Sequence, residues 1–229
     1  MNRSVAVMRM HLVDRITLFL MPTSILAASF AINVAVWSLE PPSGSRTTGA
    51  AISVYCFVLA AAMLCVTRGL PFALGMGSSR RAFTLGTGMT GLVLALVMGT
   101  AYLVLNRLEV LTNGWWLHGA FFELPWFHGT SPALLWVAFT VAFLAVFMLG
   151  ALVAAVWFRW NSSLLVIGAP ATVVVVGGGA VLLTWRHGWD NIWHWFGDLT
   201  PMSMTGWLAV ATVVFAGLTW ATLRRVRAA

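Results

Sequence analysis

Six long apolar runs constrain this chain more than any other feature of its sequence, because none of them contains Asp, Glu, Lys, Arg or His. They cover residues 16–38, 48–67, 84–105, 133–158, 163–185 and 205–223. A helix of about 20 residues crosses the hydrocarbon core of a bilayer, and one charge at its centre costs about 2.5–3.5 kcal/mol. The pattern therefore predicts an all-α integral membrane protein with six transmembrane helices in a single domain, residues 1–229.

The charged residues that remain predict the orientation of these helices. Ten arginines fall in one set of alternating loops and ends: Arg3, Arg9, Arg15, Arg68, Arg80, Arg81, Arg159, Arg224, Arg225 and Arg227. The other set contains only Arg46, Arg107 and Arg186. Since basic residues favour the cytoplasmic side, both termini are expected in the cytoplasm and the loops 106–132 and 186–204 outside. We attribute the net charge of +7 to this topology and expect no nucleic-acid partner.

Two kinds of residue that are absent from the sequence limit the possible functions of the chain. All 13 basic residues are arginine, so the chain lacks the lysine that a P-loop places on nucleotide phosphates, and Schiff-base chemistry is excluded as well. The spans also lack the carboxylates and histidines that proton-driven transporters use as relays. If the protein moves a substrate, its energy is expected to come from a partner, although sodium coupling through backbone carbonyls stays open.

The segment between the second and third runs is the most specific part of the sequence. Pro71 is expected to open a short cytoplasmic helix, Gly77 to end it in a left-handed conformation, and Ser78 or Ser79 to cap the next helix. The short helix carries more apolar surface than a solvated turn needs, in Leu70, Phe72, Leu74 and Met76. It is suited either to docking on another protein or to resting on lipid headgroups.

The run PFALGMGSSRRAFTLG at residues 71–86, followed by the third span, resembles the corresponding loop of bacterial ABC exporter permeases of the six-span, ABCG-like type. The start of the chain is similar too, with a short basic helix before a first span that contains Pro22, Asn33 and Ser29-Phe30-Ala31. The resemblance is specific over about residues 70–86 and looser over 12–34.

This resemblance implies a permease homodimer in the bacterial cytoplasmic membrane, paired with separate ATP-binding subunits. The permease itself would bind no cofactor and have no catalytic residue, because ATP and Mg would lie on the partner. The coupling helix would contact that partner through Leu70, Pro71, Phe72, Leu74, Met76, Arg80 and Arg81. Residues 1–15 would form a connecting helix, for which the spacing predicts an apolar face of Val5, Met8 and Leu12, or else a basic tail that only sets the topology.

The outer loops are rich in aromatic residues, which favour the membrane interface. Trp115, Trp116, Trp189 and Trp193 are interpreted as interfacial anchors, with an outer gate over a substrate path as the alternative. The resemblance implies re-entrant helices in the second loop. A metal site at His187, His194, Asp190 and Asp198 is disfavoured because zinc-binding histidines usually lie closer in sequence, so no metal is expected.

Two spans carry candidate path or dimer residues. In the fifth span, Pro170 is expected to kink the helix, while Gly177, Gly178 and Gly179 permit close approach of another backbone. The resemblance implies that this span lies at a dimer axis. Asn33, in the first span, is expected to hydrogen-bond to another helix.

The leading hypothesis is thus the permease subunit of an ATP-driven exporter of an amphiphilic or lipophilic substrate. One alternative is a membrane-anchored enzyme or cofactor carrier that uses outer residues such as His118, Glu123, His128, His187 and Asp190. A second is a scaffold that recruits a partner through residues 70–83. A lone ion channel ranks lower, since no span has a polar face suited to ions.

Overall fold

The computed structural model is nearly all helical. It describes residues 3–39, 46–123, 127, 129–185, 189, 197 and 199–224; over 160–183 it describes the backbone and, of the side chains, only Gly177 and Val181. The elements in chain order are α1 (Arg3–Val13), η1 (Ile16–Leu20), α2 (Met21–Leu39), β1 (Arg46–Thr47), α3 (Ile52–Gly75), α4 (Arg80–Leu111), η2 (Gly114–His118), β2 (Gly119–Ala120), α5 (Pro132–Trp185) and α7 (Pro201–Leu223). Here η marks a single wide turn with π-type hydrogen bonding.

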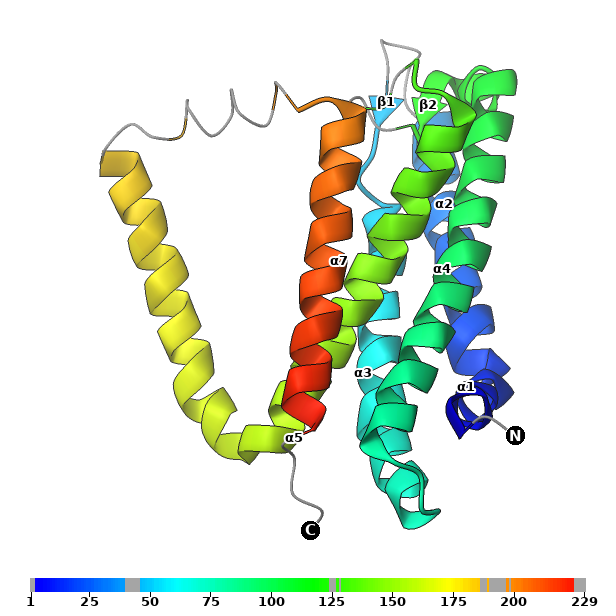
Figure 1. The fold of residues 1–229 in the computed structure, drawn as a ribbon. Helices are drawn as coiled ribbons and strands as arrows, with labels where there is room; N and C mark the ends of the chain where they lie inside the picture. Colours follow the sequence, from blue (N-terminus) through cyan, green and yellow to red (C-terminus); the bar gives the residue numbers. More distant parts are fainter. Residues whose placement is uncertain are drawn as a thin grey trace.

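Five helices in the described part of the chain are long and apolar enough to cross a membrane. They are η1 with α2, then α3, α4, the first arm of α5 to Arg159, and α7. This finding indicates a multi-pass membrane protein, as the sequence predicted. The backbone of the predicted fifth span, 163–185, belongs to α5, which bends and turns back as a second arm in Figure 1. Most of that arm's side chains lie outside the described residues.

α4 is longer than the sequence predicted. The third span was expected to end at Leu105, but α4 continues to Leu111 and includes Asn106, Arg107 and Glu109. These polar residues occupy the last turns of the helix, where an aqueous interface or the protein itself can satisfy them. Two of them, Asn106 and Glu109, are buried.

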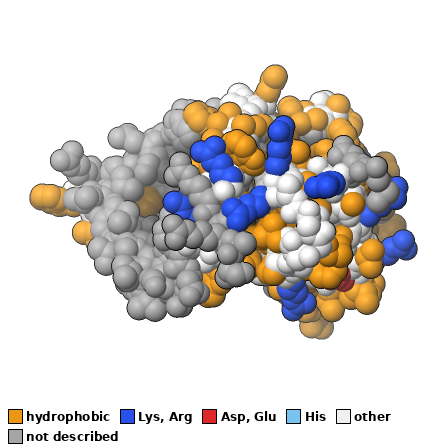
Figure 2. Space-filling view, turned by 60° about the horizontal axis from the view of Figure 1, so that its bottom comes forward, with side chains coloured by type: hydrophobic (Ala, Val, Ile, Leu, Met, Phe, Trp, Pro, Cys, Tyr) orange, Lys and Arg blue, Asp and Glu red, His pale blue; other side chains and the backbone are white. Residues whose placement is uncertain are grey.

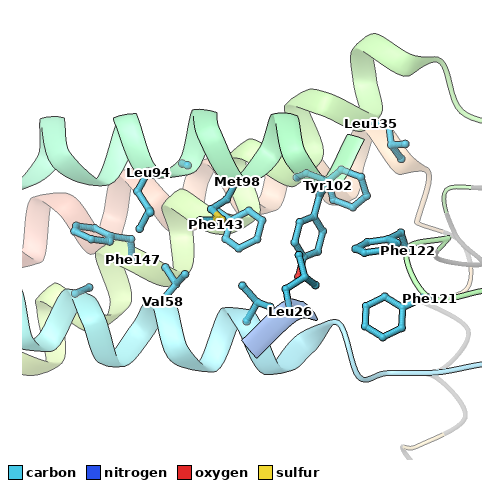
Figure 3. Close-up of a cluster of buried hydrophobic side chains, with 14 of the residues drawn as sticks. Leu26, Val58, Leu94, Met98, Tyr102, Phe121, Phe122, Leu135, Phe143 and Phe147 are labelled. Atoms are coloured by element: carbon cyan, nitrogen blue, oxygen red, sulfur yellow. The ribbon is translucent and has the colours of Figure 1, made fainter. Parts of the chain in front are cut away.

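The first arm of α5 lies at the centre of the helices and packs against α3, α4 and α7 (Figure 1). Glycines permit these close contacts, since a Cβ on Gly150 would clash with the Leu59 carbonyl on α3 and one on Gly99 with Thr140 on α5. Phe143 and Phe147 from α5 fill the interior together with Tyr102. Figure 3 shows this cluster extending to one end of the helices, where Phe121 and Phe122 enter it from the loop after α4.

A two-residue parallel bridge ties the loops together at that same end. Arg46–Thr47 (β1) pairs with Gly119–Ala120 (β2), and the Thr48 amide donates to the Ala120 carbonyl at 3.2 Å. Trp37, at the end of α2, packs directly on Gly119, where a Cβ would clash with its ring. The loop after α4 is therefore fastened to α2 and to the segment before α3.

Candidate functional site

Arginine side chains gather at one end of the molecule. α1, the end of α3, the start of α4 and the end of α7 meet there (Figure 1), and Figure 2 shows several arginines exposed on this face. They come from the set that the sequence assigned to the cytoplasm; Arg3, Arg9, Arg68, Arg81 and Arg224 are all exposed. We call this face the arginine-rich end.

The predicted separate helix beginning at Pro71 is wrong, because α3 runs without a break from Ile52 to Gly75. Pro71 lies inside α3, in its last two turns. A proline there removes one amide hydrogen bond, but the helix has only one further turn to maintain. Packing of Leu70 and Ala73, both buried, against the neighbouring helices holds this last segment in line with the rest of α3.

The turn from α3 to α4 agrees with the sequence prediction. Gly77 has φ of +75°, the left-handed conformation that ends many helices. The Ser78 amide donates to the Ala73 carbonyl at 2.9 Å, and the Gly77 amide donates to the Leu74 carbonyl at 3.0 Å. Ser79 then caps α4, since its hydroxyl accepts from the Ala82 amide at 3.2 Å. The residues 70–81 thus form a helical hairpin with a tight, well-bonded tip.

The side chains proposed for partner contact separate into two groups. Phe72 is 56% exposed and Met76 is 65% exposed, whereas Leu70 is only 2% exposed and Leu74 is half-buried against the core. Pro71 and Arg81 are exposed, and Arg80 is half-buried. A surface at the hairpin tip can therefore include Phe72, Met76 and the arginines, but Leu70 cannot reach a partner without unfolding the end of α3.

Arg80 also ties the hairpin to the last span. Its guanidinium donates to the Arg224 carbonyl at 3.2 Å, just beyond the end of α7. The Arg224 guanidinium in turn lies 5.1 Å from the centre of the Trp220 ring, a cation–π arrangement. Arg80 thus satisfies a carbonyl that the end of a helix leaves unpaired.

α1 does not use the face that the sequence predicted. Its buried residues are Ser4, Val7 and His11, whereas Val5, Met8 and Leu12 are only half-buried. Two glycines explain the difference, because they allow α1 to lie directly on the hairpin helices. A Cβ on Gly86 of α4 would lie 2.6 Å from the Val7 Cβ, and one on Gly69 of α3 would lie 2.7 Å from the His11 ring.

His11 is the central side chain of this contact. Its ring nitrogen Nε2 lies 3.2 Å from the Thr87 hydroxyl on α4, and its ring meets that of Phe83 edge-on at 5.6 Å. Burial lowers the pKa of His11 to about 4, since desolvation disfavours the charged imidazolium. His11 also lines a pocket of about 180 Å³ together with Asp14 and Arg68. The neutral imidazole thus joins α1 to α4 at neutral pH.

The opposite end is organised by one buried carboxylate, which the sequence analysis did not identify as a site. Glu109 is 1% exposed. It accepts hydrogen bonds from the backbone amides of Phe121 (2.9 Å), Phe122 (3.0 Å) and Glu123 (2.8 Å), and from the Trp115 indole (2.8 Å). The carboxylate of Glu109 is therefore saturated by donors from the loop that follows α4.

The tryptophans of the outer loops have different environments. Trp115 is half-buried and packs on Phe30 with ring centres 4.7 Å apart, while Trp116 is 79% exposed. Both have positive φ, as do Asn113 and His118. Trp189 is exposed and donates to the Thr184 hydroxyl at 2.9 Å, and Trp193 lies outside the described residues. Trp115 is thus part of the packing of the loop, and Trp116 remains available for the interface.

The candidate path residues do not meet in this single chain. Asn33 donates to the Ser29 carbonyl of its own helix at 2.8 Å, so the expected bond to another helix is wrong; its side chain finds a closer partner one turn back. Gly177 faces open space, and α5 stays helical through Pro170. The side chain of Pro170 and the surroundings of Gly178 and Gly179 lie outside the described part.

The outer residues of the enzyme hypothesis remain a prediction. His118 is exposed and Glu123 half-buried, while His128, His187 and Asp190 are not among the described residues, and neither are His194 and Asp198 of the disfavoured metal site. The geometry thus offers two organised regions: the arginine-rich end, with its apolar hairpin tip and docked α1, and the Glu109 end.

Comparison with known proteins assigns the chain to no family, since no family model, curated protein or solved structure matches it.

Proposed function

We propose that this chain is the membrane permease of an ATP-driven ABC exporter in a bacterial cytoplasmic membrane. In this proposal the chain has six spans with both ends inside, works as a homodimer and moves an amphiphilic or lipophilic substrate outward. ATP and Mg bind to a separate ATPase subunit. The proposal rests on the resemblance of residues 70–86 to the coupling loop of such permeases.

The observation that carries the proposal is the exposed apolar tip of the α3–α4 hairpin. Phe72 and Met76 are both more than half exposed at the end where arginines gather. Basic residues favour the cytoplasmic side, and an apolar patch ringed by polar residues is typical of a protein-binding surface. The tip therefore suits a docking site for a cytoplasmic subunit better than a solvated turn.

The contacts around the hairpin suggest which other elements would move if a partner displaced it. Arg80, where the hairpin enters α4, is bonded to the end of α7, and α1 rests on Gly86 and Thr87 in the next turns of α4. In the proposed mechanism, ATP binding closes the two ATPases and displaces the hairpins. The hairpin, α1 and the end of α7 would move together, because each is tied to the first turns of α4.

The test is purification of the chain from its native membranes in mild detergent at low salt. We expect a P-loop ATPase to co-purify, and Met76→Asp to reduce its yield at least tenfold while insertion is unchanged. Leu111→Asp is the matched control, since Leu111 is equally apolar and 79% exposed but lies at the other end of α4. Absence of an ATPase from the wild-type preparation would remove the basis of the proposal.

Phe72→Asp gives a second measurement at the tip, namely coupling of ATP hydrolysis to transport in reconstituted vesicles. We expect hydrolysis to continue without transport. Leu74 is a poorer choice than the sequence suggested, because its half-buried side chain contributes to folding. Full coupling in both Phe72→Asp and Met76→Asp would show that the tip is not the docking surface.

A further inference from the structure

An apolar cavity of about 360 Å³ lies between α4 and α7, with α5 and α3 behind it. Its volume is within the range of small-molecule sites, about 300–1,000 Å³. The residues that shape it are Leu85, Gly88 and Met89 on α4, Met148 on α5, and Trp220 and Leu223 on α7. Leu85, Met89 and Trp220 are exposed, so the cavity opens on the outer surface of the helices, which lipid would cover in a membrane-spanning protein.

Two arginines lie close to residues that line one end of this cavity. Thr84 lines the cavity, and its hydroxyl donates to the Arg80 carbonyl one turn earlier in α4 at 3.0 Å. On α7, Trp220 lines the cavity and has the Arg224 guanidinium 5.1 Å from its ring centre. The Arg80–Arg224 hydrogen bond brings the two residues together, so two guanidinium groups lie beyond the same end of an apolar cavity.

Neither guanidinium is neutralised within the described part of the chain. The hydrogen bond of Arg80 to the Arg224 carbonyl uses one of its five N–H donors, and the Arg224 guanidinium contacts an aromatic ring. Arginine binds phosphate through paired N–H groups, so donors remain for an anion at this position. A tryptophan beside them is typical of the level of lipid headgroups.

We propose that the α4–α7 cavity binds an anionic phospholipid of the surrounding leaflet, with one acyl chain in the cavity and the phosphate on Arg80 and Arg224. An apolar cavity that ends in paired cations matches this molecule in both shape and charge. A zwitterionic lipid would place its own cation beside the two arginines, which weakens its binding. This lipid site is independent of the proposed exporter function, since it needs only membrane insertion.

The experiment measures retained lipid by native mass spectrometry of the full-length chain in neutral detergent. Dioleoylphosphatidylglycerol and dioleoylphosphatidylcholine are added separately, so that only the headgroup differs. We expect phosphatidylglycerol to bind at least fivefold more tightly, and Arg80→Gln to remove about that factor, as one basic residue at an anionic surface would. Arg80→Lys, which keeps the charge, should recover most of the preference, whereas Arg9→Gln on α1 should leave it unchanged.

A second variant blocks the acyl chain without altering the charges. Gly88 lines the cavity, and a Cβ there would meet the Met148 side chain at 3.7 Å, an ordinary contact, so Gly88→Leu is chosen to place a side chain in the cavity. It should lower phosphatidylglycerol occupancy at least fivefold. Gly217→Leu on α7, where a Cβ meets open space, is the matched control.

Two results would overturn the proposal. They are equal binding of the two lipids to the wild-type chain and unchanged lipid occupancy in Gly88→Leu. If the second result came with a change from dimer to monomer, it would identify the cavity as a surface between two copies. Circular dichroism of each variant checks that a loss of lipid is not a loss of fold.

Discussion

The two ends of the molecule use charge in opposite ways. At the arginine-rich end the cations lie on the surface, and the buried contacts around α1 are made by neutral or apolar side chains on glycines. At the other end a single carboxylate, Glu109, is withdrawn from solvent and saturated by three backbone amides and one indole. The surface arginines leave the packing of the helices unaffected by their charge, whereas the buried acid holds the loop after α4 through its hydrogen bonds.

The two ends are expected to differ in their tolerance of substitution. An exposed charge is already solvated, so its loss changes stability little. A buried carboxylate that accepts several hydrogen bonds cannot be replaced without leaving donors unpaired. Substitutions at the two ends should therefore differ in their cost to stability.

Glu109→Gln is expected to lower the free energy of unfolding by about 3 kcal/mol. The amide nitrogen that replaces one oxygen cannot accept from the backbone N–H groups that now bind there. Unfolding in mixed micelles, followed by tryptophan fluorescence, measures the change. Asp14→Asn is the matched substitution at the other end, where the exposed carboxylate accepts from the Thr17 amide at 3.1 Å, and should cost less than about 1 kcal/mol. Equal losses in the two variants would contradict the contrast.

Gly86→Ala is expected to cost about 2–3 kcal/mol and to release α1 from α4. Its Cβ would lie 2.6 Å from the Val7 Cβ and 2.7 Å from the Ser4 carbonyl oxygen, and backbone cannot yield as a flexible side chain can. Hydrogen exchange of residues 3–13 reports the release. Gly88→Ala, two residues along the same helix, should leave exchange unchanged, and release of α1 by both variants would show that helix α4 itself is disturbed.

Acidification is expected to loosen α1 through His11. Its pKa is lowered from 6.5 to about 4, so the unfolded chain binds the proton more readily. The stability from neutral His11 is therefore full above pH 6.5 and is lost as pH falls toward about 4, with about 2 kcal/mol gone at pH 5. Asp14 does not interfere, because its pKa is lowered from 3.8 by the hydrogen bond from Thr17. Hydrogen exchange of α1, corrected for intrinsic rates, is measured at pH 7 and pH 5 in the wild type and in His11→Gln. An equal increase in exchange at pH 5 in the two proteins would exclude His11 as the cause.

Ser79→Ala gives the smallest expected effect, a loss of about 1 kcal/mol from the missing cap on α4. Thermal unfolding in detergent is a suitable measurement. Ser78→Ala serves as the control, since the Ala82 amide bonds to Ser79 and not to Ser78. A larger loss in Ser78→Ala would show that the cap is misassigned.

Local signals in the sequence predicted the apolar helices and the hairpin tip well. Uncharged runs define candidate spans by composition alone, and Gly77 and Ser79 act within a few residues of their own positions. The prediction that a separate helix begins at Pro71 was wrong because burial of Leu70 and Ala73 outweighed the backbone hydrogen bond that the proline removes. The predicted buried face of α1 was wrong because the face that is buried depends on contacts with Gly69 and Gly86, which lie far from α1 in the sequence.

Glu109 was missed for the same reason. Its partners follow it by 6 to 14 residues, and three of them are backbone amides, which leave no trace in side-chain chemistry. The available signal was an acidic residue just after an apolar run, followed by a loop with Gly114 and Gly119. The exporter function and the homodimer stay predictions, because they concern partners that a single chain does not contain.

The run of positive φ at Asn113, Trp115, Trp116 and His118 has an evolutionary consequence. Each non-glycine residue in this region costs about 1–3 kcal/mol and persists only where its surroundings require it. We therefore expect the Glu109 carboxylate and the unusual backbone to be kept or lost together. A descendant that lost the carboxylate would be free to acquire an ordinary loop, with glycines or a different length in place of the two tryptophans.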